Sequence, residues 1–191
     1  QIELVERAEG EPSRWSFSGV PVDHAIKGFG GAVLGSNNPK QTMLVLEEIL
    51  GLAKIGEDQG QVRYRSTGDI GNIIDVNIGQ EERGTAGAGT VHHIAWRAKD
   101  FAEHEAWRSL VEEAGLRPTQ IVDRQYFNAV YFREPGGILF EIATDPPGFA
   151  RDEPKEEMGT HLMLPEWYEP QREVIEQLLP DIQVRALGGV Q

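Results

Sequence analysis

The chain of 191 residues contains no cysteine, and this absence excludes several kinds of chemistry. Without thiols there is no disulfide, no thiolate nucleophile, no zinc finger and no cysteine-ligated cluster. The sequence also lacks any apolar run near the ~20 residues needed to cross a bilayer, and no stretch of it reads as a signal peptide. We therefore expect a cytoplasmic protein with no membrane partner.

Positive charge is scarce as well, with 18 Lys and Arg against 31 Asp and Glu, a formal net charge of −13. Such a chain repels the phosphate backbone, so we expect no nucleic-acid partner. The other proportions, 39% hydrophobic and 26% charged residues, are typical of a globular protein with a proper core. The length suits one domain of two similar halves, or two small domains.

A pattern of one strand, one helix and three strands occurs twice, which predicts an α+β fold of paired βαβββ modules at 26–80 and 89–146. In the first copy we expect a strand at 26–34, a helix at 42–50, and strands at 53–56, 62–65 and 72–78. In the second we expect a strand at 91–98, a helix at 101–114, and strands at 119–124, 129–132 and 138–144.

The segments outside the repeat have simpler interpretations. Residues 1–7 resemble the last strand of the second copy, with Glu3 at the position of Glu141. We expect them to be the final strand of a preceding module that belongs to a missing N-terminal domain. Residues 8–25, rich in Gly, Pro and Ser, predict a linker. Residues 147–191 predict a C-terminal arm with a short amphipathic helix at 170–179, for which we expect no catalytic role.

Two adjacent histidines, His92 and His93, lie in the expected strand 91–98. Because neighbouring strand residues point to opposite faces, only one of them is expected to face a given cavity, and periodicity does not choose between them. The ordinary explanation is one core histidine bonded to the backbone and one solvated histidine.

Glu141 changes that balance, because it lies inside the apolar strand 138–144, where an unpaired carboxylate is costly to bury. Strands 91–98 and 138–144 begin and end one module and can be neighbours in its sheet, so His93 and Glu141 can lie across from each other. Imidazole plus carboxylate is two-thirds of a 2-His-1-carboxylate metal site. The alternative is an ion pair of Glu141 with Arg124 or Arg133.

A third metal ligand is not evident in the sequence. Gly30 and Gly31 stand at the histidine positions of the first copy, and Asp75, which matches Glu141, is equally explained as a solvent-facing residue. We therefore expect the missing ligand to come from the absent N-terminal part or from another chain. Three further histidines are interpreted as surface residues of the linker, of the polar face of the helix and of the tail: His24, His104 and His161.

Arg124 and Tyr131 fall on two expected strands that a short turn joins, so both can face the same cavity. Arg124 could hold an anionic or phenolate oxygen, and Tyr131 could donate a hydrogen bond or transfer a proton. An ordinary strand arginine and a tyrosine at the edge of the core are the alternative.

Three stretches, 89–96, 123–127 and 131–145, resemble the ring-cleaving dioxygenases of the glyoxalase/bleomycin-resistance (vicinal oxygen chelate) superfamily, and within it the hydroquinone-type branch. The resemblance covers nearly the whole chain, including the tail at 162–180. It implies four βαβββ modules with curved mixed sheets in two domains. This chain would hold the third and fourth modules and the final strand of the second.

The resemblance also implies an activity and a set of roles. His93 and Glu141 match two ligands of Fe(II), sometimes Mn(II), and the remaining histidine ligand would lie in the missing first module. His92, Arg124 and Tyr131 match substrate-binding and catalytic positions. The implied enzyme is a metal-dependent, extradiol-type dioxygenase that cleaves an aromatic diol of hydroquinone or catechol type with O2 in the degradation of aromatic compounds. The chain alone is then expected to bind metal weakly and to have little activity.

Two other functions stay open on this fold. One is a glyoxalase-like isomerase or thiol transferase, which uses metal ligands on equivalent strands. The other is a metal-free binding module, which the glycines at positions 30 and 31 would suit. For the assembly we expect a homodimer or pairing with the missing N-terminal domain.

Overall fold

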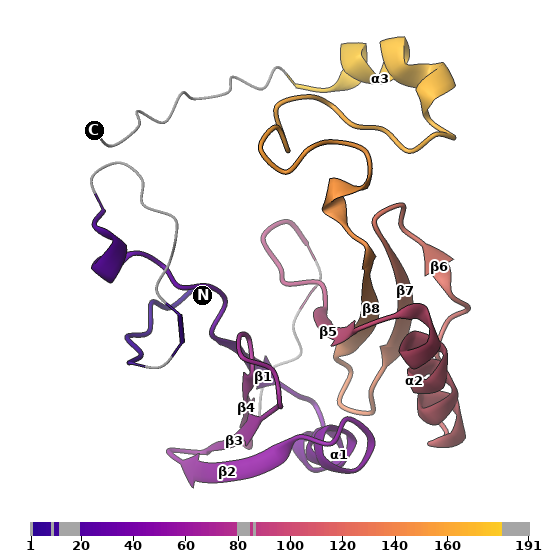
Figure 1. Ribbon diagram of the computed structural model, residues 1–191. Coiled ribbons are helices and arrows are strands. Elements are labelled where there is room, and N and C mark those ends of the chain that lie inside the picture. Colours follow the sequence, from indigo (N-terminus) through magenta and orange to yellow (C-terminus); the bar gives the residue numbers. More distant parts are fainter. Residues whose placement is uncertain (1, 9, 12–19, 80–84, 86, 181–191) are drawn as a thin grey trace.

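The structure is a computed structural model that describes residues 2–8, 10–11, 20–79, 85 and 87–180 (Figure 1). Its described part contains two four-stranded mixed sheets, each accompanied by one main helix, and neither sheet closes into a barrel. The predicted α+β fold is therefore confirmed. No helix in these described ranges is both long enough and apolar enough to span a membrane.

The first sheet has the strand order β1-β4-β3-β2, and β1 runs parallel to β4 while the other neighbours are antiparallel. Its strands are β1 (Gly31–Gly35), β2 (Ala53–Asp58), β3 (Gln61–Arg65) and β4 (Ile73–Asn77). Helix α1 (Pro39–Leu44) follows β1 and continues into a π-helical turn, η2 (Val45–Ile49). The Asn38 side chain caps α1, and Pro39 is the first residue of the helix. Asparagine and proline are both favoured at these positions.

The second sheet repeats this topology in the order β5-β8-β7-β6, with β5 parallel to β8. Its strands are β5 (Ile94–Ala98), β6 (Val122–Asp123), β7 (Phe127–Arg133) and β8 (Leu139–Pro147). Helix α2 (Phe101–Glu113) starts at Asp100, whose carboxylate accepts the backbone N–H of Glu103. The predicted order of strand, helix and three strands is therefore present in both halves.

Both opening strands begin later than the sequence predicted. β1 starts at Gly31 rather than at residue 26, and β5 starts at Ile94 rather than at residue 91. Ile94 is the first residue of β5 paired with β8, where it lies opposite Phe140. His92 and His93 therefore precede the strand, and the expectation that they lie within it was wrong.

The segments of the described chain outside the two modules contain four short helices. These are η1 (Val22–His24), η3 (Phe149–Arg151), η4 (Glu169–Gln171) and α3 (Arg172–Leu178), the last of which matches the helix predicted at 170–179. Residues 2–8 form no strand, and the strand predicted at 1–7 would pair with a module outside this chain, so it stays a prediction. Parts of the linker (9, 12–19), the end of the first module (80), the segment between the modules (81–84, 86), residue 1 and the end of the arm (181–191) lie outside the described residues.

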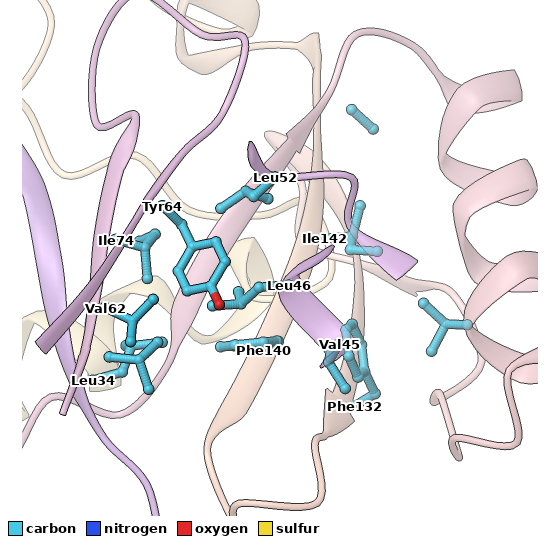
Figure 2. Packing of buried hydrophobic residues seen from close by; sticks show 13 residues of the cluster. Leu34, Val45, Leu46, Leu52, Val62, Tyr64, Ile74, Phe132, Phe140 and Ile142 are labelled. Atoms are coloured by element: carbon cyan, nitrogen blue, oxygen red, sulfur yellow. The ribbon is translucent and has the colours of Figure 1, made fainter. Parts of the chain in front are cut away.

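One cluster of buried apolar side chains extends through both modules (Figure 2). Leu46 and Tyr64 from the first half belong to the same cluster as Phe132, Phe140 and Ile142 from the second, and each is at most 1% exposed. Full burial of one such side chain contributes roughly 1.5–3 kcal/mol. The helix-bearing faces of the sheets therefore share one core, and each sheet keeps an opposite face, here called the open face.

A buried carboxylate joins the two modules at the turn between β7 and β8. Glu134 is 2% exposed and accepts hydrogen bonds from the Thr42 hydroxyl at the start of α1 and from the backbone N–H groups of Gly136 and Ile138, each at 2.7 Å. The Asn37 N–H also donates to the Gly136 carbonyl at 2.9 Å. Three donors satisfy a charge that would otherwise be costly to bury, so this turn is tied to the first module.

Replacement of Gly136 tests this connection. A Cβ at position 136 would lie 2.0 Å from Ser36 Oγ and 2.3 Å from Thr42 Oγ1, both of which belong to the buried network. Gly136→Ala should cost roughly 1–3 kcal/mol and lower the Tm by several degrees in thermal unfolding followed by circular dichroism. Gly56→Ala is the control because a Cβ there meets nothing within 4 Å. Equal Tm values for the two variants would contradict the inferred tie.

Tyr64 gives the fold an alkaline pH dependence. Its side chain is fully buried, and its hydroxyl donates to Glu47 Oε1 at 2.6 Å. Burial first, and then Glu47, raise the pKa of Tyr64 above its ordinary value of 10.0. The unfolded chain therefore loses this proton first, so the stability is complete below about pH 10 and falls as the pH rises beyond it.

Urea unfolding at pH 8 and pH 11 should show this loss. The native chain is expected to lose about 1 kcal/mol more over that interval than Tyr64→Phe, which has no proton to release. The comparison isolates Tyr64, since every other titrating group is shared by both proteins. An identical loss in the two proteins would show that the buried hydroxyl does not carry the effect.

Candidate active site

Three side chains meet on the open face of the second sheet, and Glu141 is at their centre. In the middle of β8, Glu141 lies opposite Ala95 of β5 and Tyr131 of β7. Its carboxylate is nearly fully buried, with 4% of the side chain exposed. One oxygen, Oε2, lies 2.6 Å from His93 Nε2, and the other, Oε1, accepts the Tyr131 hydroxyl at 2.9 Å. The predicted meeting of His93 and Glu141 is therefore present, although His93 lies just before β5 rather than within it.

Arg124 reaches the same cluster from the turn after β6. Its Nη2 lies 3.4 Å from the Tyr131 hydroxyl, and its guanidinium carbon lies 5.5 Å from the centre of the Tyr131 ring. Burial is the largest influence that raises the pKa of Tyr131, and the bond to Glu141 raises it further, whereas Arg124 lowers it. Tyr131 is thus held as a protonated donor, and the structure brings the two predicted residues together.

The ion pairs that the sequence left open for Glu141 are not found among the described residues. Arg124 contacts Tyr131 rather than the carboxylate, and Arg133 donates to the Gly137 carbonyl within its own turn. The partners of Glu141 are an imidazole and a phenol. The carboxylate is therefore not neutralised by an arginine.

His92 lies on the same side as His93, which corrects the expectation that only one of the pair could face a given cavity. The two Nδ1 atoms are 2.9 Å apart, and the rings meet edge to face with centroids 5.1 Å apart. Both residues precede β5, so the alternation of a strand does not apply to them. His93 thus presents Nδ1 to His92 and Nε2 to Glu141.

His104 was wrongly predicted as a surface residue. It is fully buried on the inner side of α2, and its Nε2 lies 2.8 Å from the Ile142 carbonyl in β8. The spacing from His104 to the buried Val111 is seven residues, two helical turns, and this spacing could have revealed the inward face. The two other histidines interpreted as surface residues, His24 and His161, are exposed.

In the first module, an ion pair occupies the position that corresponds to Glu141. Asp75 is 7% exposed, so the solvent-facing interpretation was wrong, and both of its oxygens accept from Arg63 at 2.8 Å. Arg63 lies opposite Asp75 as Tyr131 lies opposite Glu141. At the position that matches His93, a Cβ on Gly31 would lie 2.1 Å from the Ile73 carbonyl oxygen, so no side chain fits.

The donor atoms of the second module suit a divalent metal ion in part. An imidazole nitrogen and a carboxylate oxygen that point at each other are ligands that Fe, Mn and Zn accept. Within the residues that the structure describes, no group of three or more His, Cys, Asp or Glu side chains could hold such an ion. His93 and Glu141 therefore bring two suitable donor atoms together, and the described residues add no third His, Cys, Asp or Glu side chain to them.

Comparison with known proteins gives one family. A family model described as the Glyoxalase/Bleomycin resistance protein/Dioxygenase superfamily matches residues 22–142. A Bacillus subtilis (strain 168) protein named "Putative ring-cleaving dioxygenase MhqO" is 55% identical over 186 residues, which are 97% of this chain and 60% of that protein. The chlorohydroquinone/hydroquinone 1,2-dioxygenase of Sphingobium indicum is 32% identical over 169 residues, which are 84% of this chain and 52% of that enzyme.

A solved structure is similar over the same extent. The crystal structure of a protein described as a "putative dioxygenase" of Bacillus subtilis subsp. subtilis strain 168 superposes with a TM-score of 0.91 at 55% identity. The match covers 95% of this chain and 58% of that one. This chain therefore spans between 52% and 60% of the length of these relatives.

Two arginine–aspartate pairs on the open faces, Arg63–Asp75 and Arg97–Asp145, differ in burial and so test how burial changes the contribution of an ion pair to stability. Arg63 and Arg97 each make two bonds of 2.8–2.9 Å to one carboxylate, but the Asp75 side chain is 10% exposed and that of Asp145 is 43% exposed. Arg63→Met leaves a mostly buried carboxylate unpaired and should lower the free energy of unfolding by roughly 1–3 kcal/mol. Arg97→Met should cost less than ~1 kcal/mol. Urea unfolding at pH 7 measures both, and equal costs would contradict the inferred role of burial.

Proposed function

This chain belongs to the Glyoxalase/Bleomycin resistance protein/Dioxygenase superfamily, as predicted from its sequence, and from that membership we propose that it is the metal-binding part of an extradiol-type ring-cleaving dioxygenase. The observation that carries the proposal is the buried Glu141 carboxylate, shared by the His93 imidazole and the Tyr131 phenol, with Arg124 beside them. A buried carboxylate without a fixed cation is the group expected to accept a metal ion.

His93 Nε2 and Glu141 Oε2 would hold the metal, Fe(II) or in some members Mn(II). Their 2.6 Å contact places both donor atoms at one point on the open face. A third ligand, a histidine, would come from a preceding module or from another chain. When bound, such an ion would bring the aromatic diol and O2 together and would allow electron transfer between them.

The other residues of the cluster act on the substrate's oxygen atoms and protons. Arg124 stands where it can compensate the negative charge of a phenolate oxygen, since its guanidinium already lies against the Tyr131 hydroxyl. Tyr131 is protonated, and its hydroxyl, which here donates to Glu141, can turn to donate to that oxygen instead. His92, in contact with His93, is placed to act as a general acid or base toward the substrate.

The substrate proposed is an aromatic diol of hydroquinone or catechol type. Support comes from the names of two relatives, one called a ring-cleaving dioxygenase and one a hydroquinone dioxygenase. Because the chain spans only 60% and 52% of these relatives, the activity of the whole protein is part of the proposal. The same open-face cluster would also serve a glyoxalase-like isomerase, and the absence of a third ligand among the described residues would suit a metal-free binding module.

Removal of a ligand tests the metal site. Glu141→Gln and His93→Ala should each weaken the binding of Mn(II), followed by calorimetric titration of this chain, by about tenfold or more. Asp145→Asn, which changes an exposed carboxylate on the same strand, should leave the binding unchanged. Native affinity in Glu141→Gln would overturn the assignment of this carboxylate as a ligand.

Oxygen uptake tests the reaction. With Fe(II) added, hydroquinone or catechol should be consumed together with O2 when this chain is joined to the part of the Bacillus subtilis relative that it does not match. Arg124→Ala and Tyr131→Phe should retain iron but lower kcat/KM by roughly 10- to 1,000-fold, because they remove interactions with the reacting oxygen rather than a ligand. An iron-loaded protein that consumes no O2 with any diol would favour the isomerase.

A further inference from the structure

The direction of Arg124 depends on a turn that the chain holds in an unfavourable conformation. Residues 124–126 join β6 to β7, and Gln125, which directly follows Arg124, has a φ of 70° and is 6% exposed. A non-glycine residue in this left-handed region costs roughly 1–2 kcal/mol. Such a conformation persists only where the surroundings enforce it, so the contacts of this turn identify what holds Arg124 in place.

Charged side chains bind both backbone groups of the strained residue. The Gln125 N–H donates to Asp123 Oδ1 at 2.7 Å, and the Gln125 carbonyl accepts Arg151 Nη1 at 2.7 Å. Asp123 is the last residue of β6, next to the turn, but Arg151 comes from η3, which follows β8. The carbonyl is therefore fixed by a residue 26 positions away in the sequence.

The segment 148–152 makes further contacts with the same turn. The Gly148 N–H donates to the Tyr126 carbonyl at 2.9 Å, and the Tyr126 hydroxyl donates to Asp152 Oδ2 at 2.9 Å. The Phe149 ring stacks on Tyr126, with centroids 5.2 Å apart and an interplanar angle of 23°. Three backbone or side-chain bonds and one ring contact thus link this segment to residues 125 and 126.

We propose that residues 148–152 form a clamp that sets the direction of Arg124, and that Arg151 is a positioning residue of the candidate active site. Release of the Gln125 carbonyl lets the strained residue relax toward negative φ. Because a change of φ at Gln125 rotates the chain next to Arg124, the guanidinium leaves the Tyr131 ring. The start of the C-terminal arm thereby acts on the site through one backbone carbonyl.

The position of Arg124 can be measured in this chain without metal or substrate. A guanidinium above an aromatic ring has its Nε–H proton signal shifted upfield, and ¹H–¹⁵N spectra detect that signal, assigned by its loss in Arg124→Lys. Arg151→Ala should move the signal toward the position of a free arginine by at least half of the shift seen in Tyr131→Leu. Arg151→Lys, which keeps a donor for the carbonyl, should restore most of it.

Two further variants test the ring contact and provide a control. Phe149→Leu removes the ring contact with Tyr126 and should move the Arg124 signal in the same direction as Arg151→Ala. Arg172→Ala is the matched control, since Arg172 also donates to a backbone carbonyl, that of Leu162, in the C-terminal arm near α3. An Arg124 signal that is unchanged in Arg151→Ala and in Phe149→Leu, while both variants stay folded, would overturn the proposal.

The kinetic consequence rests on the proposed dioxygenase function and is tested separately. In the iron-loaded protein, Arg151→Ala should lower kcat/KM for the diol about tenfold, but less than twofold further when Arg124 is already alanine, because the two residues act as one unit. An additive loss would contradict action through Arg124. If the Arg124 signal moves as expected but the iron-loaded native protein consumes no O2 with any diol, the proposed function fails while the clamp stands.

Discussion

The carboxylate of Glu141 sets the constraint on which the candidate site depends. It lies in the middle of a strand with neighbours on both sides, so water cannot solvate it and the protein must supply its partners. The chain meets the same requirement at two other buried acids in different ways. Glu134 is bound by neutral donors and joins the modules, and Asp75 is bound by a guanidinium. Only Glu141 has partners that can exchange a proton.

The comparison of the modules gives a physical reason why the proposed site lies on the open face of the second sheet and not on that of the first. Topology places Asp75 and Glu141 at corresponding register positions, but the residue opposite is Arg63 in one module and Tyr131 in the other. A guanidinium is a permanent cation attached to the chain, so it neutralises Asp75 and leaves no place for another ion. A phenol and an imidazole hold Glu141 without neutralising it permanently. This difference is the physical reason why the proposed metal site lies in the second module and not in the first.

Much of this could be predicted from the sequence because it follows from pattern. The repeat gave the order of elements in both sheets, and a carboxylate in an apolar strand indicated the meeting of His93 and Glu141. The predictions that failed concern features that depend on contacts between residues far apart in the sequence. The starts of β1 and β5 are set by the extent of pairing with β4 and β8, so His92 was misplaced. Glu134 looks like an ordinary turn residue until Thr42, 92 positions away, is seen to donate to it.

The clamp on Gln125 shows how the site extends beyond the residues that touch it. An arginine side chain has many rotamers, and it compensates a developing charge efficiently only if it is held in place before the charge appears. Here the order comes from the backbone: Arg151 and Asp123 bind the two polar groups of the residue beside Arg124. The Tyr131 ring then limits the guanidinium to one direction. The cost of the strained φ is thus offset by contacts made on the surface, and the site obtains a directed cation without an ion pair that would neutralise Glu141.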